Sequence, residues 1–266
     1  MGGPDPAATA FIEGLAAEVE VTLGPELVGL VLYGSAVTGG FDPGISDVDL
    51  VAVTASGIEH VDLGRLRLMH EAIVDRQPVW RDRVEVAYLG QAALRGFRTS
   101  RGPLAVISPG EPLHRSDSRP ADWLQNWFFA RETGIALRGP RPRTLIPPIR
   151  RSELVAAVRR YAGEVAGRDR STASGGAISY AILTLCRAWR TVETGAMTSK
   201  AEGAGWAVGR MPAWSSFIEA ALRARIGLGG FEDALTRADA ETLIDRLAAE
   251  IAAARPRHRR PGPASK

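Results

Sequence analysis

The chain has 266 residues, enough for one large domain or for two smaller domains that each bury a hydrophobic core. Its formal net charge is +3, yet the first hundred residues hold 14 acidic and 7 basic side chains, so the basic excess lies in the remainder. The single cysteine excludes an intrachain disulfide, and no segment approaches the roughly 18 uninterrupted apolar residues of a membrane span. The N-terminus lacks the basic and apolar regions of a signal peptide. We therefore expect a cytoplasmic protein with no membrane partner.

The chain opens with a predicted helix followed by a predicted strand. Residues Pro6 to Thr22 carry apolar side chains at helical spacing. Leu27 to Tyr33 is a mostly apolar run that stops at Gly34, which is typical of a strand buried on both faces. Gly34 has no side chain to block a close approach, and Ser35 brings a hydroxyl and a backbone N–H to the start of a short predicted helix. The turn therefore suits an anion such as a phosphate.

Two aspartates begin the next strand. A loop rich in Gly and Pro, from Gly39 to Ser46, leads to Asp47, Val48 and Asp49 and then to a second apolar run. Residues two apart on a strand point to the same face, so the two carboxylates would lie side by side. Like charges this close raise one pKa unless a cation lies between them. Taken alone, the pair also fits a solvated turn, but oxygen ligands suit Mg²⁺, with a triphosphate supplying the others.

A third carboxylate lies on the third predicted strand. Leu63 to Gln77 has helical spacing, and we interpret its His70 as a helix-face residue rather than a ligand. Arg83 to Leu89 alternates as a strand, with Glu85 on the face opposite the valines. An exposed edge strand would explain this glutamate without a function. Placed beside the two aspartates, it could share a metal or accept the proton of an attacking hydroxyl.

The remainder predicts a loop, a helix, a linker and a helical bundle. Residues 95–120 read as a loop with a short apolar run, and 121–138 return to helical spacing. Residues 139–150 hold four prolines, which predict an extended linker and a domain boundary. Five helices are predicted beyond it, the first with Ser152 as its N-cap, over 152–167, 178–193, 201–210, 213–226 and 238–254. The predicted domains are 1–150 and 151–254, followed by a disordered basic tail, 255–266.

The strand, the Gly-Ser pair and, roughly ten residues later, an Asp-x-Asp that opens another strand resemble the polymerase-beta-like nucleotidyltransferases. The segments 32–37, 46–50 and 183–189 are similar to the streptomycin/spectinomycin adenylyltransferases, which are bacterial aminoglycoside nucleotidyltransferases. The likeness runs over nearly the whole chain. It implies an α+β fold in which an N-terminal nucleotidyltransferase domain, a mixed sheet with helices, precedes a C-terminal α-helical bundle.

The resemblance also implies the roles of individual residues. Asp47 and Asp49 would hold Mg²⁺, and Glu85 would be the catalytic base and a further metal ligand. The nucleotide, ATP as the substrate, would be bound by Gly34, Ser35, Ser46, Arg187 and Lys200. The last two match family positions on the helical domain that reach the triphosphate. For Lys200 a solvated helix start is the alternative.

We predict a Mg²⁺-dependent enzyme that moves AMP from ATP to a hydroxyl of a small molecule, an aminoglycoside or aminocyclitol such as spectinomycin. The family holds its cationic drug with an aromatic after a Gly-Glu pair and two acids before the LTL motif. Here Pro112 follows Glu111, and residues 171–180 contain no acid, so a stacking surface and two charge partners are missing. The same chemistry on a protein or an RNA, and a non-catalytic nucleotide sensor, are the alternatives. We expect a monomer that does not bind nucleic acid.

Overall fold

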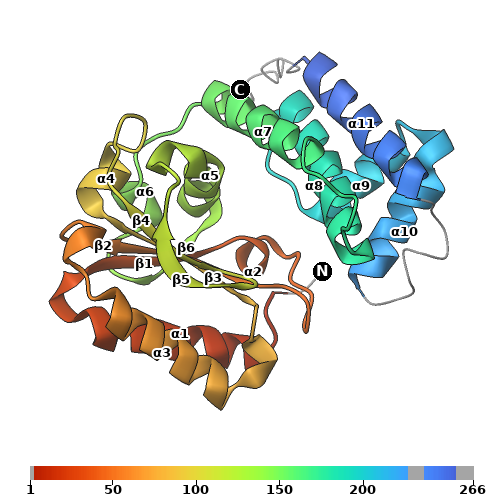
Figure 1. The fold of residues 1–266 in the computed structure, drawn as a ribbon. Coiled ribbons are helices and arrows are strands. Elements are labelled where there is room, and N and C mark those ends of the chain that lie inside the picture. Colours follow the sequence, from red (N-terminus) through yellow and green to blue (C-terminus); the bar gives the residue numbers. More distant parts are fainter. Residues whose placement is uncertain (1–2, 227–236, 256–266) are drawn as a thin grey trace, which may run out of the picture. The chain divides into compact units, whose positions relative to one another are not determined.

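The computed structural model describes residues 3–226 and 237–255, and the chain divides into two compact units. The first unit ends at Ile149 and the second begins at Arg150. The first contains the six strands found in the described ranges, whereas the second is helical (Figure 1). Of the basic tail predicted over 255–266, all but the first residue lies outside the described residues.

The first unit is built on one mixed sheet. Its strands are β1 (Leu27–Tyr33), β2 (Val48–Thr54), β3 (Val84–Gly90), β4 (Leu104–Ser108), β5 (Glu111–Ser116) and β6 (Ile135–Arg138). Their order is β5-β4-β3-β2-β1-β6, with β2 and β3 parallel and the other neighbours antiparallel. The helices are α1 (Pro6–Leu23), α2 (Ser35–Thr38), α3 (Leu63–Arg76), α4 (Gln91–Arg95), α5 (Leu124–Thr133) and α6 (Pro142–Leu145). Figure 1 shows α1 and α3 on one face of the sheet and α4, α5 and α6 on the other.

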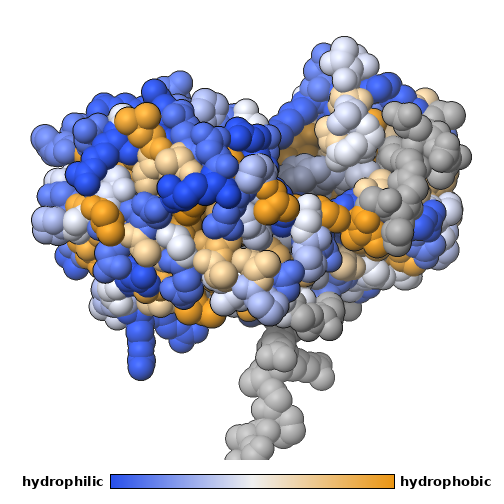
Figure 2. All heavy atoms as spheres, turned by 90° about the horizontal axis from the view of Figure 1, so that it is seen from below, coloured by the Kyte–Doolittle hydropathy of each residue, from blue (hydrophilic) through white to orange (hydrophobic). Residues whose placement is uncertain are grey.

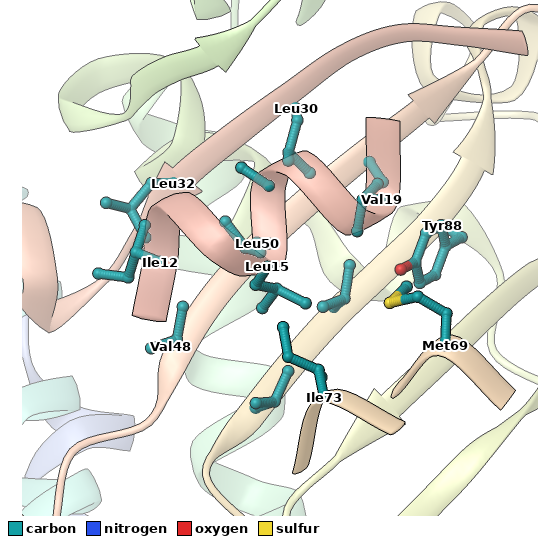
Figure 3. Close-up of a cluster of buried hydrophobic side chains, with 14 of the residues drawn as sticks. Ile12, Leu15, Val19, Leu30, Leu32, Val48, Leu50, Met69, Ile73 and Tyr88 are labelled. Carbon is teal, nitrogen blue, oxygen red and sulfur yellow. The ribbon is translucent and has the colours of Figure 1, made fainter. Parts of the chain in front are cut away.

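The central strands are buried on both faces, as the sequence predicts for β1. Alternate side chains enter two separate cores, because successive residues of a strand point to opposite faces. Leu30 and Leu50 belong to the core beneath α1 and α3, which we call the first core. Val31 and Val51 belong to the core on the opposite face, which we call the second core. Figure 3 shows side chains of the first core: Ile12, Leu15, Val19, Leu30, Leu32, Val48, Leu50, Met69, Ile73 and Tyr88.

The loop predicted over residues 95–120 is wrong in part, because the chain forms the hairpin of β4 and β5 there. The two strands pair antiparallel, and Gly110 at their turn has a φ of +79° that favours glycine. The sequence signal for β5 is weak because this strand lies at the sheet edge, and of its side chains only Leu113 is buried. An edge strand that is polar on most positions lacks the apolar alternation by which strands are predicted.

The helix predicted over residues 121–138 is also wrong at its C-terminal end. Helix α5 stops at Thr133, and the four residues after Gly134 form β6 on the edge of β1. A Cβ at Gly134 would lie 2.2 Å from the Ala130 carbonyl oxygen and 2.7 Å from Val31 Cγ1. The chain therefore turns against the sheet at a position where only glycine fits, and pairing with β1 decides the conformation that follows.

The proline-rich segment 139–150 is not a purely extended linker. It contains the short helix α6, and Leu145 and Ile146 are buried in the second core. Prolines at the first turn of a helix are tolerated, since their missing N–H has no partner within the helix there.

The second unit is a helical bundle, as predicted. Its helices are α7 (Arg151–Ala166), α8 (Gly175–Thr194), α9 (Lys200–Val208), α10 (Ser215–Arg225) and α11 (Arg237–Ala253). Helix α8 packs against each of the other four, which explains why it is apolar on most sides. The predicted N-cap Ser152 is wrong. Helix α7 begins one residue earlier, and the backbone N–H of Arg150 donates to Glu153 Oε2 at 2.8 Å, as in a capping box.

On the face drawn in Figure 2, hydrophobic residues are scattered among hydrophilic ones. Exposed large apolar side chains of the first unit include Val21, Leu68 and Val79. Single apolar side chains of this kind are ordinary on a globular protein. Of the helices in the described part of the chain, none has both the length and the apolar character needed to cross a membrane.

The buried face of α3 carries a histidine that should make stability depend on pH. His70 is 2% exposed, and its Nε2 lies 2.8 Å from the hydroxyl of Tyr88. Burial lowers the pKa of His70 to about 4 from its usual 6.5. The unfolded chain therefore takes up this proton at a higher pH than the folded chain does. We expect the free energy of unfolding to fall by about 3 kcal/mol as the pH drops from about 6.5 to about 4.

Urea denaturation across that pH range measures this effect, with His70→Gln as the comparison. The variant cannot take up the proton, so its free energy of unfolding should change less between these pH values. An identical pH dependence in both proteins would contradict the assignment to His70.

Candidate active site

Three polar side chains lie in one row across the central strands. Asp49 of β2 is paired with Tyr33 of β1 on one side and with Glu85 of β3 on the other. All three occupy the odd-numbered positions whose apolar neighbours, such as Val51 and Ala87, form the second core. The register of the sheet therefore brings the predicted base opposite one of the predicted metal ligands.

The turn after β1 fits closely under this row. Gly34 has a φ of +75°, and a Cβ there would lie 1.9 Å from Asp49 Oδ2. The carboxylate of Asp49 thus occupies the space that any other side chain at position 34 would need. Gly34 therefore permits a close approach, as predicted, but the group that approaches it within the protein is the carboxylate of Asp49.

The next residue presents an unused hydroxyl. Ser35 begins α2, and its Oγ is buried without a hydrogen-bond partner among the described residues. A buried hydroxyl in this state costs free energy unless a ligand or a water satisfies it. A phosphate oxygen at this turn would satisfy it, so the site fits the predicted nucleotide.

The loop before the aspartates is held by Arg83, which sequence analysis did not identify. Its Nε and Nη2 donate to the carbonyl oxygen of Ser46 at 3.0 and 2.7 Å, and its own carbonyl accepts from the N–H of Val48 at 2.8 Å. Burial lowers the pKa of the Arg83 guanidinium, while the negative charge of Asp47 acts in the opposite direction. Arg83 therefore fixes the end of the loop and places a positive charge near Asp47.

Two of the predicted residues in this loop differ in detail from expectation. Asp47 precedes β2 rather than opening it, since the strand begins at Val48. Both Asp47 and Asp49 are half-buried, whereas Val48 between them is fully buried. The hydroxyl of Ser46 accepts from the N–H of Asp42 at 2.9 Å, so it closes the loop but keeps its own proton to donate.

Glu85 has two polar partners that the sequence did not reveal. The hydroxyl of Tyr33 donates to Glu85 Oε1 at 3.1 Å. Asn126 of α5 donates from Nδ2 to the Tyr33 hydroxyl at 2.9 Å and to Glu85 Oε1 at 3.4 Å. Burial raises the pKa of Tyr33 well above its usual value, and the charges of Glu85 and Asp49 raise it further. Tyr33 is therefore a proton donor at any ordinary pH.

The donor set suits a hard cation, because carboxylate oxygens are the ligands that Mg²⁺ prefers. Over the residues that the structure describes, no group of three or more His, Cys, Asp or Glu side chains gathers into a metal site. The assignment of Asp47, Asp49 and Glu85 to a metal stays a prediction.

The two predicted cationic residues lie on neighbouring helices of the second unit. A Cβ at Gly203 of α9 would lie 2.6 Å from the Cα of Arg187 on α8, so these helices cross at a distance that only glycine allows. Lys200 is the first residue of α9, and its Nζ lies 4.0 Å from the ring centroid of Tyr180. Their role in nucleotide binding stays a prediction.

Comparison with known proteins identifies both parts of the chain. A nucleotidyltransferase domain model matches residues 17–95, and a model of the aminoglycoside adenylyltransferase C-terminal domain matches residues 144–252. The aminoglycoside (3'') (9) adenylyltransferase of Klebsiella pneumoniae is 26% identical over 249 residues, which are 83% of this chain and 86% of the relative. The spectinomycin 9-adenylyltransferase of Staphylococcus aureus is 28% identical over 211 residues, 73% of this chain and 75% of the relative.

A solved structure has the same fold. The crystal structure of spectinomycin adenyltransferase from Enterococcus faecialis, with ATP and spectinomycin, superposes with a TM-score of 0.74 over 92% of this chain and 99% of that one, at 17% identity. The predicted α+β fold, a nucleotidyltransferase domain followed by a helical bundle, is thereby confirmed. The chain is an enzyme of the nucleotidyltransferase type, which combines a nucleotidyltransferase domain with the C-terminal domain of the aminoglycoside adenylyltransferases.

Proposed function

We propose that this enzyme moves AMP from Mg²⁺-bound ATP to a hydroxyl of an aminocyclitol or aminoglycoside, with spectinomycin as the first candidate. The observation that carries the proposal is the row in which Asp49 lies opposite Glu85 and directly over Gly34. A metal ligand and a base on neighbouring strands can act on the same phosphate group. The names of the relatives point to the same chemistry and to the same class of acceptor.

The first unit would bind the phosphates through its turn and its loop. Ser35 would donate its unpartnered hydroxyl to a phosphate oxygen, and Ser46 would donate the proton that its present bond to Asp42 leaves unused. Glycine at position 34 lets the backbone of the turn lie against Asp49, because any side chain there would collide with the Asp49 carboxylate.

The carboxylates would divide the chemistry between them. Asp47 and Asp49 would hold Mg²⁺, and Glu85 could contribute a further oxygen. When bound, the ion would neutralise negative charge on the phosphate oxygens as pyrophosphate leaves. Glu85 would take the proton of the acceptor hydroxyl. The hydroxyl oxygen would form a bond to the α-phosphorus as the bond from that phosphorus to the bridging oxygen breaks.

Two cations of the second unit would complete nucleotide binding. Arg187 and Lys200 would each contribute a positive charge to the triphosphate, which carries several negative charges. The close crossing of α8 and α9 at Gly203 supports this pairing, since it fixes the helices that carry the two side chains.

The acceptor is proposed from what the chain lacks. Pro112 stands where the family has an aromatic, and residues 171–180 carry no acid. Of the acids upstream, Asp169 accepts from the N–H and the hydroxyl of Ser171, and Glu164 forms an ion pair with Arg160. The segment itself therefore supplies no charge partner for a drug with several cationic groups, which favours spectinomycin over streptomycin.

The test is pyrophosphate release from Mg²⁺-ATP across a panel of aminoglycosides and aminocyclitols, with mass spectrometry of the drug. A gain of one AMP on spectinomycin supports the proposal. Addition of AMP to a protein or an RNA, and to none of the drugs, would mean that the same chemistry acts on a macromolecule. Binding of ATP with no release of pyrophosphate in the presence of any acceptor would contradict the proposed activity and indicate a nucleotide sensor.

Asp49 should be indispensable for turnover but not for folding. We expect Asp49→Asn, which keeps the volume and removes the charge, to lower kcat by about a thousand-fold or more, because the metal loses a charged ligand. Steady-state pyrophosphate release measures the change, and the thermal midpoint checks the fold. Turnover near that of the unaltered enzyme would refute the role of Asp49.

Gly34 should matter through both its backbone conformation and the space that it leaves free. We expect Gly34→Ala to lower kcat by about a hundred-fold and stability by about 1–3 kcal/mol, since the new Cβ must displace the Asp49 carboxylate. The matched control is Gly39→Ala, which also has a positive φ, +78°, but has no atom within 4 Å of the added Cβ. It should lose stability only. Equal losses of kcat in the two variants would mean that strain alone, and not Asp49, explains the effect.

A further inference from the structure

We propose that Tyr33 and Asn126 are positioning residues for the catalytic base, which fix the orientation of the Glu85 carboxylate through hydrogen bonds to its Oε1. The inference rests on the proposed role of Glu85 as the base.

The chemistry of the three groups fixes the direction of each hydrogen bond. A carboxylate can only accept, so the amide of Asn126 must turn its nitrogen toward Glu85. The same nitrogen donates to the hydroxyl of Tyr33, 2.9 Å away. Tyr33 has one proton, and it donates this proton to Glu85 Oε1 at 3.1 Å. The network therefore has one arrangement, in which both donors point to the same carboxylate oxygen.

The donors come from parts of the fold that cannot easily move. Tyr33 is 3% exposed, and its ring is part of the second core. Asn126 precedes Trp127, which is fully buried in the same core and donates from Nε1 to the Pro120 carbonyl at 2.7 Å. Since the side chain of Trp127 anchors α5, the amide of Asn126 is held at a fixed place over the sheet.

The consequence is a base whose carboxylate is held in one orientation. Two donors to Oε1 restrain rotation of the Glu85 carboxyl group. The folded protein has therefore already ordered this long side chain, and its conformational entropy need not be lost when the substrates bind. The carboxylate of Glu85 then accepts the proton of the acceptor hydroxyl, as the hydroxyl oxygen forms its bond to the α-phosphorus and pyrophosphate leaves with the bridging oxygen. The proton ends on Glu85, and no other reactant is needed.

The test compares two tyrosines that lie on opposite faces of the same sheet. Tyr33→Phe removes the donor to Glu85 and keeps the ring. Tyr88→Phe removes an equally buried hydroxyl, the one bonded to His70 in the first core, and is the matched control. We expect Tyr33→Phe to lower kcat by about 10- to 100-fold with the KM for ATP little changed, because orientation of the base is lost and nucleotide contacts are not. Tyr88→Phe should leave both constants unchanged.

Two variants of Asn126 test the same point independently. Asn126→Leu should lower kcat by a similar factor. Asn126→Asp should lower it further, because a second carboxylate would face Glu85. A neighbouring change on the same helix, Gln125→Ala, should have no effect on kcat.

The outcomes separate this inference from the proposed function. If Glu85→Gln abolishes turnover while Tyr33→Phe and Asn126→Leu keep the kcat of the unaltered enzyme, the positioning role is wrong and the base assignment stands. If Glu85→Gln retains turnover, the base assignment itself fails. A rise in the KM for ATP with no change in kcat in the Tyr33 and Asn126 variants would also contradict positioning of the base.

Discussion

The register of β1, β2 and β3 is the constraint on which the candidate site depends. Each strand is buried on both faces, so a shift of one residue would exchange every side chain between the two cores. Such a shift of β2 would bury Asp49 beneath α1 and α3 and turn Val48 to the site. Burying a carboxylate without a partner costs several kcal/mol. Hydrophobic packing thus places the row of Tyr33, Asp49 and Glu85 as strictly as any polar contact within it.

Polar contacts then refine what the register sets. Arg83 holds the Ser46 carbonyl immediately before Asp47, and Asn126 joins Tyr33 to Glu85. Each of these contacts satisfies a polar group that the fold half-buries, so the arrangement serves stability as well as position. The hydroxyl of Ser35 is the exception, since its atom is buried and the described chain gives it no partner. A buried hydroxyl without a partner, one residue after the glycine that lies against Asp49, is where a substrate oxygen would be expected.

Local patterns in the sequence predict most of the helices and strands and point to the candidate catalytic residues, but they do not reveal the residues that support these side chains. Apolar alternation is a property of neighbours in sequence, which is why β1, β3 and the five helices of the bundle were predicted nearly to their ends. The partners of Glu85 are distant, since Tyr33 and Asn126 are 52 and 41 residues away along the chain. The strand β6 was missed for the same reason, because a helix-compatible segment was overruled by pairing with β1.

The same contrast bears on the acceptor. Of the residues proposed for chemistry, Asp49 and Glu85 stand on strands that are buried on both faces, and Asp47 directly precedes one of these strands, so a change there costs stability. The positions at which the resemblance predicts a departure from the family lie elsewhere: Glu111 and Pro112 are exposed on the edge strand β5, and most residues of 171–177, which end in the first turn of α8, are exposed. Substitution at exposed positions costs little folding free energy, usually less than about 0.5 kcal/mol. Acceptor recognition can therefore change while the nucleotidyl transfer site is retained, and the family chemistry constrains the reaction more tightly than it constrains the drug.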